Sequence, residues 1–148
     1  MQKKIILISC SSKKGDKKAK AKDIYKSQLF KSSLAYAYRH KPDKIFILSA
    51  LHCLLDIEKV ISPYDVTLSK VPKAKRHDGL TVLTQPEKII WGVKVIEQLS
   101  KQADIMKDTF IVLAGVEYIK PIKESIINLI TPLKGKRQGE RVKFLNEN

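Results

Sequence analysis

A short run of hydroxyl, thiol and ammonium side chains stands near the start of the chain. Ser9, Cys10, Ser11 and Lys13 follow directly after the apolar run Ile5–Ile8. Hydroxyls, backbone N–H groups and ammonium groups just past a strand suit an anionic oxygen, such as that of a phosphate or a carboxylate. The segment lacks the glycines of a P-loop or a dinucleotide-binding turn, so neither is predicted. The alternative is a polar turn with solvated lysines.

The two cysteines of the chain have different interpretations. Neighbouring lysines favour the thiolate of Cys10, which would make it a nucleophile, whereas a cysteine just past an inner strand also serves as a small apolar side chain. Cys53 is predicted to pack. Together with His52 they lack the paired spacing of a zinc site, and we predict neither metal nor cofactor. Two cysteines are too few for a disulfide framework, which favours a cytoplasmic location.

Acid–base candidates follow two further apolar runs. His52 comes after Ile45–Leu48 and Ser49, and it is either a ligand-orienting or acid–base group or a structural histidine. Asp65 would accept a hydrogen bond from a nucleobase or transfer a proton. It would pair with His52 if its segment folds back over the sheet edge. The alternative for Asp65 is to cap its own turn. Its neighbour Tyr64 is predicted to stack on a nucleobase.

The third run, Phe110–Leu113, leads into a group of candidates on its carboxyl side. Gly115 allows the backbone to approach a ligand closely. Glu117 is a third acid–base candidate, and its alternative role is to begin a helix with a favourable charge near the dipole. We place Tyr118 and Ser49 in the ligand-binding set with these residues.

The charge of the chain is large and clustered. Lys and Arg total 29 against 15 acidic residues, giving a net charge of +14, beyond the magnitude of roughly 2 to 8 that suits a small soluble domain. Such an excess favours polyanions, although generic use of lysine for solubility would also produce it. The basic residues gather in 13–26 and 134–143. The residues predicted to contact nucleic-acid phosphates are Lys14, Lys73, Lys75, Arg76, Lys136, Arg137 and Arg141.

The three apolar runs also predict the architecture that positions these residues. Continuous runs of this kind are typical of strands buried on both faces, and ligands bind beyond the carboxyl ends of such parallel strands. The 148 residues are predicted to form a single α/β domain, with three layers, a mostly parallel central sheet and helices on both faces. No apolar stretch approaches the roughly 18 residues of a membrane span.

Further elements are predicted from spacing and from helix signals. Helices are expected over 27–40, with Ser27 as N-cap, over about 85–102, over 117–130 and near the C-terminus. On the helix at 85–102 the predicted buried face comprises Ile89, Ile90, Val93, Ile96 and Leu99. Residues 13–22 are expected to be a mobile loop, 60–61 and 66 short strands, and 71–84 a basic excursion or lid.

Several separated motifs resemble an uncharacterised bacterial and phage domain family. That family begins with an SCSKKK strand-turn and carries LSALHGLL followed by PYD. The matching residues are Ser9–Lys14, Asp23–Ser27, Phe30, Leu48–Leu55, Pro63–Asp65, Leu113–Gly115, Tyr118, Pro132, Leu133, Gly135 and Gly139. The chain departs from the family at Ser12, where lysine is usual, and at Cys53, where glycine is usual.

Two more distant families share parts of this pattern. The segment Leu48–Tyr64 is similar to one in the YaaA peroxide-stress proteins, and this likeness implies DNA binding. The opening resembles a domain found with archaeosine and tRNA-guanine transglycosylase enzymes, which implies work on modified bases. The chain lacks the Lys-Pro-Tyr-Ser block of that domain.

Three functions are consistent with these observations. In the first, the protein binds DNA or RNA and recognises or processes a nucleobase at the sheet edge, including at the N-glycosidic bond. In the second, it is a non-enzymatic basic nucleic-acid-binding module. In the third, it is an enzyme of small nucleotides or nucleosides, which needs the pocket but not the basic segments. Whether it is an enzyme, and its oligomeric state, stay open.

Overall fold

Five strands form the central sheet of the computed structural model, which describes residues 2–148. Their order is β4-β3-β1-β8-β9. Strands β1 (Lys4–Ser9), β3 (Lys44–Ser49), β8 (Thr109–Leu113) and β9 (Asn128–Ile130) are parallel, and β4 (Cys53–Asp56) pairs antiparallel with β3. The three apolar runs are the three inner strands, so the prediction of an α/β fold with a mostly parallel central sheet is confirmed.

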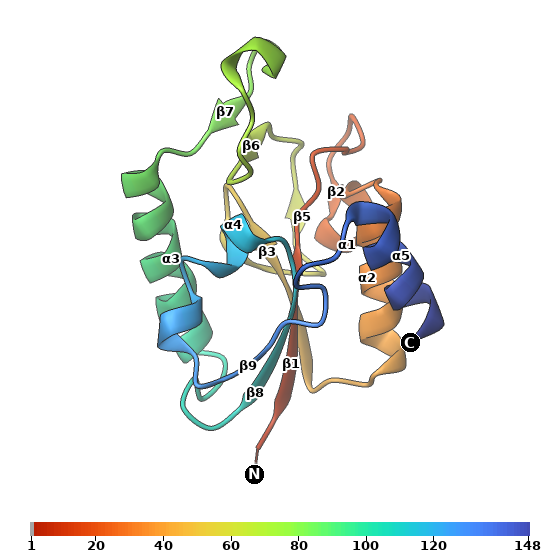
Figure 1. Ribbon diagram of the computed structural model, residues 1–148, viewed down its shortest axis with the longest axis vertical. Helices are drawn as coiled ribbons and strands as arrows, with labels where there is room; N and C mark the ends of the chain where they lie inside the picture. Colours follow the sequence, from red (N-terminus) through yellow and green to blue (C-terminus); the bar gives the residue numbers. More distant parts are fainter. Residues whose placement is uncertain (1) are drawn as a thin grey trace.

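The helices pack against the sheet through two buried clusters. Figure 1 shows α3 (Gln85–Ser100) on one side of the sheet and α2 (Gln28–Arg39) with α5 (Gln138–Glu147) on the other. Along β1, Ile5 and Leu7 belong to the cluster of α3, whereas Ile6 and Ile8 belong to the cluster of α2 and α5. Consecutive residues of β1 must all be apolar because helices cover both faces of the strand.

Side chains cap the starts of two helices. The Ser27 hydroxyl accepts a hydrogen bond from the N–H of Phe30 at 3.1 Å, which confirms Ser27 as the N-cap of α2. At α3, the Thr84 hydroxyl and the Glu87 carboxylate form a reciprocal capping box. No helix in residues 2–148 is long and apolar enough to cross a membrane.

The buried face of α3 differs from the prediction. Ile89, Ile90 and Val93 are exposed, with Ile89 at 66%. The buried residues are Lys88, Trp91, Gly92, Val95 and Leu99. Tertiary partners decide this rotation of the helix, because the Trp91 indole N–H donates to the Ser49 carbonyl at 2.8 Å. Such partners are not visible in the hydropathy of the helix itself.

The predicted helix over 117–130 is wrong. Only α4 (Val116–Ile119) is α-helical, and it is followed by the 3-10 helix η2 (Lys123–Ser125) and by strand β9. Pro121 lacks the N–H that a continuing helix needs. The apolar residues from Ile126 to Ile130 instead add a parallel strand beside β8, where β-branched side chains are favoured.

The basic segment 13–22, predicted to be a loop, contains short elements of secondary structure. It includes β2 (Ala19–Lys20), which pairs antiparallel with β5 (Val60–Ile61), and it leads into the helix α1 (Ala21–Ile24). A bridge also joins Lys14 to Tyr25. The segment predicted as a mobile loop therefore contains regular secondary structure over 19–22.

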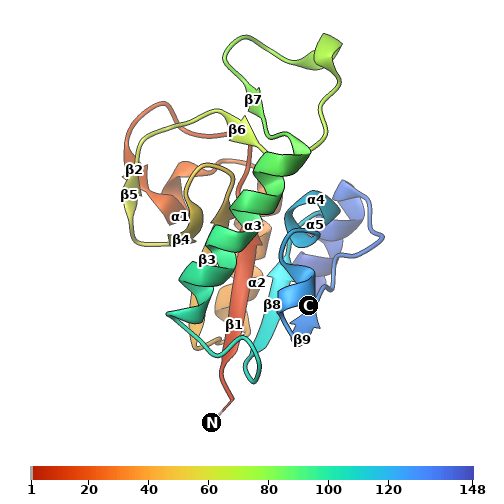
Figure 2. The same ribbon diagram turned by 90° about the vertical axis from the view of Figure 1, so that its left-hand side faces the viewer.

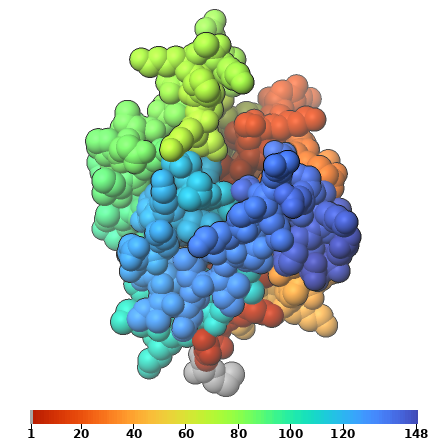
Figure 3. All heavy atoms as spheres, in the orientation of Figure 1, coloured from red at the N-terminus to blue at the C-terminus, as the bar shows by residue number. Residues whose placement is uncertain are grey.

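The predicted basic excursion is present between two short parallel strands. β6 (Val66–Thr67) pairs with β7 (Thr81–Val82), and the segment between them contains the 3-10 helix η1 (Lys73–Lys75). Figures 1 and 2 show this segment beyond the carboxyl end of β1, and the space-filling view in Figure 3 shows it projecting at that end of the molecule. It therefore stands beside the predicted site.

Cys53 begins β4 with a φ of 63°, a backbone conformation that glycine adopts most readily. Glycine is also the usual residue at this position in the bacterial and phage family that the sequence resembles. Both Cys53→Gly and Cys53→Ala remove the half-buried thiol, but only glycine removes the Cβ clash. We expect the glycine variant to exceed the alanine variant in free energy of unfolding by about 1 kcal/mol. Urea denaturation of the pair measures this, and an alanine variant of equal or greater stability would contradict it.

Candidate functional site

A cleft of about 550 Å³ lies at the carboxyl ends of β1 and β8. Its walls come from the segment after β1, from the excursion, from α4 and from the start of α5. This is the end of a parallel sheet at which ligands bind, because strand ends and loops converge there. The polar and charged residues that line it are Ser9, Cys10, Ser12, Lys14, Asp65, Thr67, Ser69, Lys70, Lys75, His77, Glu117, Tyr118, Gln138 and Arg141.

Lys14 lines the cleft above two aromatic rings. Its Nζ lies 4.3 Å from the centroid of the Tyr64 ring and 5.7 Å from that of Tyr25. Burial lowers the pKa of Lys14, and the nearby Cys10 and Asp65 oppose this shift without cancelling it. The ammonium is thus held by ring faces, because no carboxylate in residues 2–148 comes within 4.0 Å of it.

Below Lys14, a chain of buried hydroxyls fixes the aromatic rings. The Tyr25 and Tyr64 hydroxyls are 2.6 Å apart, and Tyr64 is also 2.8 Å from the Ser49 hydroxyl. Ser49 is fully buried and accepts from the N–H of His52 at 3.0 Å. Burial raises the pKa of Tyr64, so its phenol stays neutral. Tyr64 and Ser49, both predicted to contact a ligand, support the floor beneath Lys14 and do not line the cleft.

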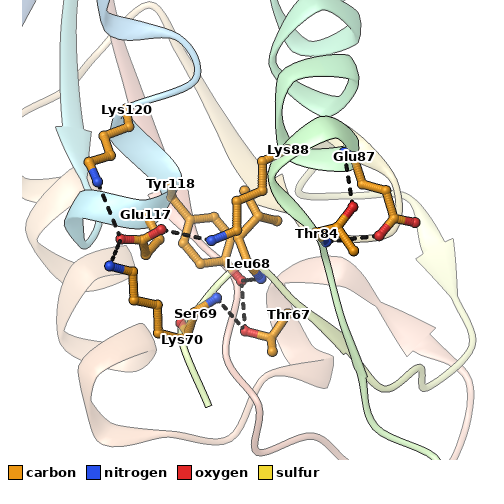
Figure 4. Close-up of polar contacts among 10 residues, drawn as sticks. All are labelled: Thr67, Leu68, Ser69, Lys70, Thr84, Glu87, Lys88, Glu117, Tyr118 and Lys120. Atoms are coloured by element: carbon orange, nitrogen blue, oxygen red, sulfur yellow. Dashed lines mark hydrogen bonds and ion pairs between the residues drawn. The ribbon is translucent and has the colours of Figure 1, made fainter. Parts of the chain in front are cut away.

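Glu117 is the centre of a cluster of ammonium groups (Figure 4). Its carboxylate pairs with Lys88 at 2.7 Å, and Lys120 and Lys70 lie at 3.8 and 3.9 Å. The side chains of Lys88 and Glu117 are only 7% and 12% exposed. The hydrogen bond from Lys88 and the surrounding charges hold the pKa of Glu117 below its ordinary value. Glu117 is therefore an anion at neutral pH, suited to accept hydrogen bonds and not to donate a proton.

Tyr118 joins α4 to both the first strand and the excursion. Its hydroxyl lies 3.4 Å from the Cys10 sulfur, and it accepts a hydrogen bond from the N–H of Leu68 at 3.4 Å. Leu68 is fully buried, and burial raises the pKa of Tyr118. The base of the excursion is thus anchored on α4, close to the Cys10 thiol.

The histidine that contacts Asp65 is His77 and not His52. The Nε2 of His77 lies 2.5 Å from the Asp65 carboxylate, and both residues line the cleft. A carboxylate fixes the orientation and tautomer of an imidazole, which prepares it to transfer protons. His52 does not line this cleft; its ring lies edge-on to Tyr64, 5.4 Å between centroids, and its Nε2 is buried without a hydrogen bond. Burial lowers its pKa.

The basic residues predicted to contact phosphates divide into two groups. Lys14, Lys75 and Arg141 line the cleft. Lys73, Arg76, Lys136 and Arg137 do not line it and stand on the segments that flank it. Arg141 extends over Gly115, where an added Cβ would lie 3.5 Å from the guanidinium. Ser11 lines a smaller adjoining pocket with Ser9 and Ser12, and Lys13 is exposed.

Several polar residues of the site were not predicted from the sequence: Thr67, Ser69, His77, Lys88 and Gln138. His77 stood unnoticed in the basic excursion, although the chain has only three histidines. Lys88 had a detectable signal, because it lies three and seven residues before Trp91 and Val95, at helical spacing on the same face. Gln138 had no such signal, since only the packing of α5 brings it to the cleft.

A family model matches almost the whole chain. Residues 5–147 match the model of the family of unknown function DUF6884. A search of the curated proteins and a search of the solved structures each found no match. The matched segment runs from the second residue of β1 to the last residue of α5, and it therefore includes every element that lines the cleft. The chain belongs to the DUF6884 family.

Proposed function

We propose that the protein binds DNA or RNA and takes one nucleotide into the cleft, where the nucleobase or its N-glycosidic bond is exposed to the polar wall. The observation that carries this proposal is an imbalance of charge. Both carboxylates of the cleft are already paired, Asp65 with His77 and Glu117 with Lys88. In residues 2–148 no carboxylate lies within 4.0 Å of the cleft cations Lys75 and Arg141. Those two are available for an anionic ligand.

The size and shape of the cleft fit one nucleotide unit. A volume of about 550 Å³ lies within the 300 to 1,000 Å³ of ordinary small-ligand sites. The hydroxyls of Ser9, Ser12 and Ser69 suit sugar or phosphate oxygens. A base in the cleft would meet the acceptors Asp65 and Glu117, and a flipped or single-stranded base reaches such a pocket most easily.

The flanking segments extend the positive surface beyond the cleft. Lys73 and Arg76 stand on the excursion, and Lys136 and Arg137 precede α5. A polymer that leaves one nucleotide in the cleft would place neighbouring phosphates against these segments. This requirement favours a nucleic acid over a free nucleotide, which would use the cleft alone.

The proposal also includes the type of nucleic acid, the location of the protein, the layers of the domain and the chemistry of the cleft. The resemblance to the YaaA proteins and to the transglycosylase-associated domain supports DNA binding and work on bases, and the proposed location is the cytoplasm. We also propose the three-layer α/β arrangement for the domain, supported by the separate buried clusters on the two faces of the sheet. Nucleobase processing is proposed for the cleft, with His77 and Asp65 as its proton-transferring pair.

Fluorescence anisotropy with labelled single- and double-stranded DNA and RNA, over a salt series, tests the proposal. The double variant Lys75→Gln/Arg141→Gln should flatten the slope of the logarithm of the binding constant against the logarithm of salt concentration by about two. Near 0.1 M salt, each lost contact should weaken binding about tenfold. The physical reason is the release of fewer counterions when fewer phosphates are neutralised.

The matched control is Lys101→Gln, an exposed lysine at the opposite end of the sheet. It removes one positive charge without touching the cleft, so its slope should equal that of the wild type. A slope reduced as much per charge in the control as in the cleft variant would show attraction by net charge alone. Absence of binding at low salt would refute the proposal for all four polymers.

A further inference from the structure

We propose that the Lys14 amine forms an imine with the C1′ aldehyde of a base-free deoxyribose in DNA, the sugar that remains when an N-glycosidic bond is broken. This inference rests on the proposed function and names the substrate class of the same cleft. Lys14 lines the cleft from the segment after β1. Among the described lysines that line the cleft, only Lys14 has its amine nitrogen within 6 Å of an aromatic ring centroid.

The surroundings of Lys14 suit a nucleophilic amine. A lysine paired with a carboxylate stays protonated, whereas Lys14 lies over the faces of Tyr64 and Tyr25, which attract an ammonium less strongly than a carboxylate does. The phenols of these rings bond to each other and to Ser49, and in the described residues neither forms a hydrogen bond with the amine. Half-burial lowers the pKa of Lys14 and increases its free-amine fraction at neutral pH.

Groups that move protons line the same cleft. His77 is oriented by Asp65 at 2.5 Å, and the Asp65 carboxylate is near enough to Lys14 to influence its titration. The imidazole can therefore give a proton to a departing oxygen and accept one from carbon. No metal or redox group is required for either transfer.

The chemistry balances with these groups alone. The Lys14 nitrogen attacks the C1′ aldehyde, the C–N bond forms, and the aldehyde oxygen leaves as water with protons from the amine and from His77. The imine then makes the C2′ hydrogen acidic. If His77 removes that proton, the C2′–H electron pair forms the C2′=C3′ bond and the C3′–O bond breaks, so that the 3′ phosphate leaves. Hydrolysis of the imine restores Lys14.

Borohydride trapping provides the test. The purified full chain is incubated with a labelled oligonucleotide that has one abasic deoxyribose, and sodium borohydride reduces any imine to a stable amine. We expect a covalent complex on a denaturing gel, with the modified peptide containing Lys14 by mass spectrometry. Lys14→Arg keeps the positive charge but has no primary amine, so trapping at saturating protein should fall about tenfold or more.

Two controls separate this inference from the proposed function. Lys17→Arg changes an exposed lysine of the same segment and should trap as the wild type does. An oligonucleotide with tetrahydrofuran in place of the abasic sugar has no aldehyde, and its anisotropy measures binding alone. Binding without trapping overturns the inference but leaves the proposed function, whereas absence of both overturns both.

Equal trapping in Lys14→Arg and Lys17→Arg also overturns the inference, since exposed lysines would then react indiscriminately. Thermal unfolding of each variant shows whether it is folded. If Lys14→Arg does not fold, the trapped wild-type peptide decides the matter, because modification at any other lysine contradicts the assignment.

Discussion

Replacement of Gly92 by alanine should lower the free energy of unfolding by about 2 to 3 kcal/mol, although the same change in an ordinary helix raises it by about 1 kcal/mol. Gly92 lies on the buried face of α3, where the backbone of Pro121 approaches it. An added Cβ would lie 2.4 Å from the Pro121 carbonyl oxygen and 2.7 Å from its Cβ. Neither atom belongs to a flexible side chain, so α3 or the segment after α4 must move.

Gly139→Ala is the matched control. Gly139 stands in the first turn of α5, and an added Cβ would meet nothing within 4 Å. This substitution should raise the free energy of unfolding by about 0.5 kcal/mol through helix propensity. Urea denaturation followed by circular dichroism compares the two variants with the wild type. A Gly92→Ala variant that is as stable as the wild type would contradict the close approach.

The contact at Gly92 also bears on the site. Pro121 lies two residues after the end of α4, which carries Glu117 and Tyr118 into the cleft. A shift of this segment would move Glu117 relative to Lys88 on α3. Part of the lost stability should therefore come from a weakened Lys88–Glu117 ion pair. The cleft should be perturbed in any Gly92→Ala molecules that still fold.

The inner strands and the site edge were predictable from the sequence because their signals are local. The run Ile5–Ile8 is apolar on both faces, and such runs are typical of covered parallel strands. Once three of them are parallel, the residues after them meet at one edge. The Cys10 sulfur and the Tyr118 hydroxyl, from residues 108 apart in the sequence, lie 3.4 Å apart at that edge.

What could not be predicted depends on contacts between distant segments. Ile89 and Ile90 are as apolar as the core residues of α3, but Trp91 and Lys88 have the partners that fix the buried face. The edge strand β9 was mistaken for a helix because its length and pairing are set by β8. His77 reaches Asp65 only because β6 and β7 pair and close the excursion between them.

Lys88→Met should lower the free energy of unfolding by about 3 kcal/mol, because it leaves the Glu117 carboxylate without its closest partner. Methionine keeps most of the apolar stem of lysine, so the lost charge dominates. The cost stays near the lower end for a broken buried pair, since Lys70 and Lys120 remain at 3.9 and 3.8 Å. These two lysines are largely exposed and compensate only in part.

A double-mutant cycle with Glu117→Gln isolates the pair. Glu117→Gln alone leaves the buried Lys88 ammonium with only an amide oxygen, at a cost of about 2 kcal/mol. The double variant removes both charges and should be less destabilised than the sum of the two by about 1 to 3 kcal/mol. Additive effects would show that the 2.7 Å contact contributes no coupling.

The pH dependence has a definite sign. Because the folded protein holds the pKa of Glu117 below its ordinary value, the stability from this carboxylate is fully present above the unfolded pKa of about 4.3 and is lost as pH falls through the folded value. The difference between wild type and Lys88→Met should therefore be constant from about pH 6 to 8 and shrink below about pH 4.3. Glu117→Gln should lack this acidic loss. If the difference persists undiminished at pH 3, the destabilisation comes from packing at position 88 and not from the ion pair that holds α4 at the cleft.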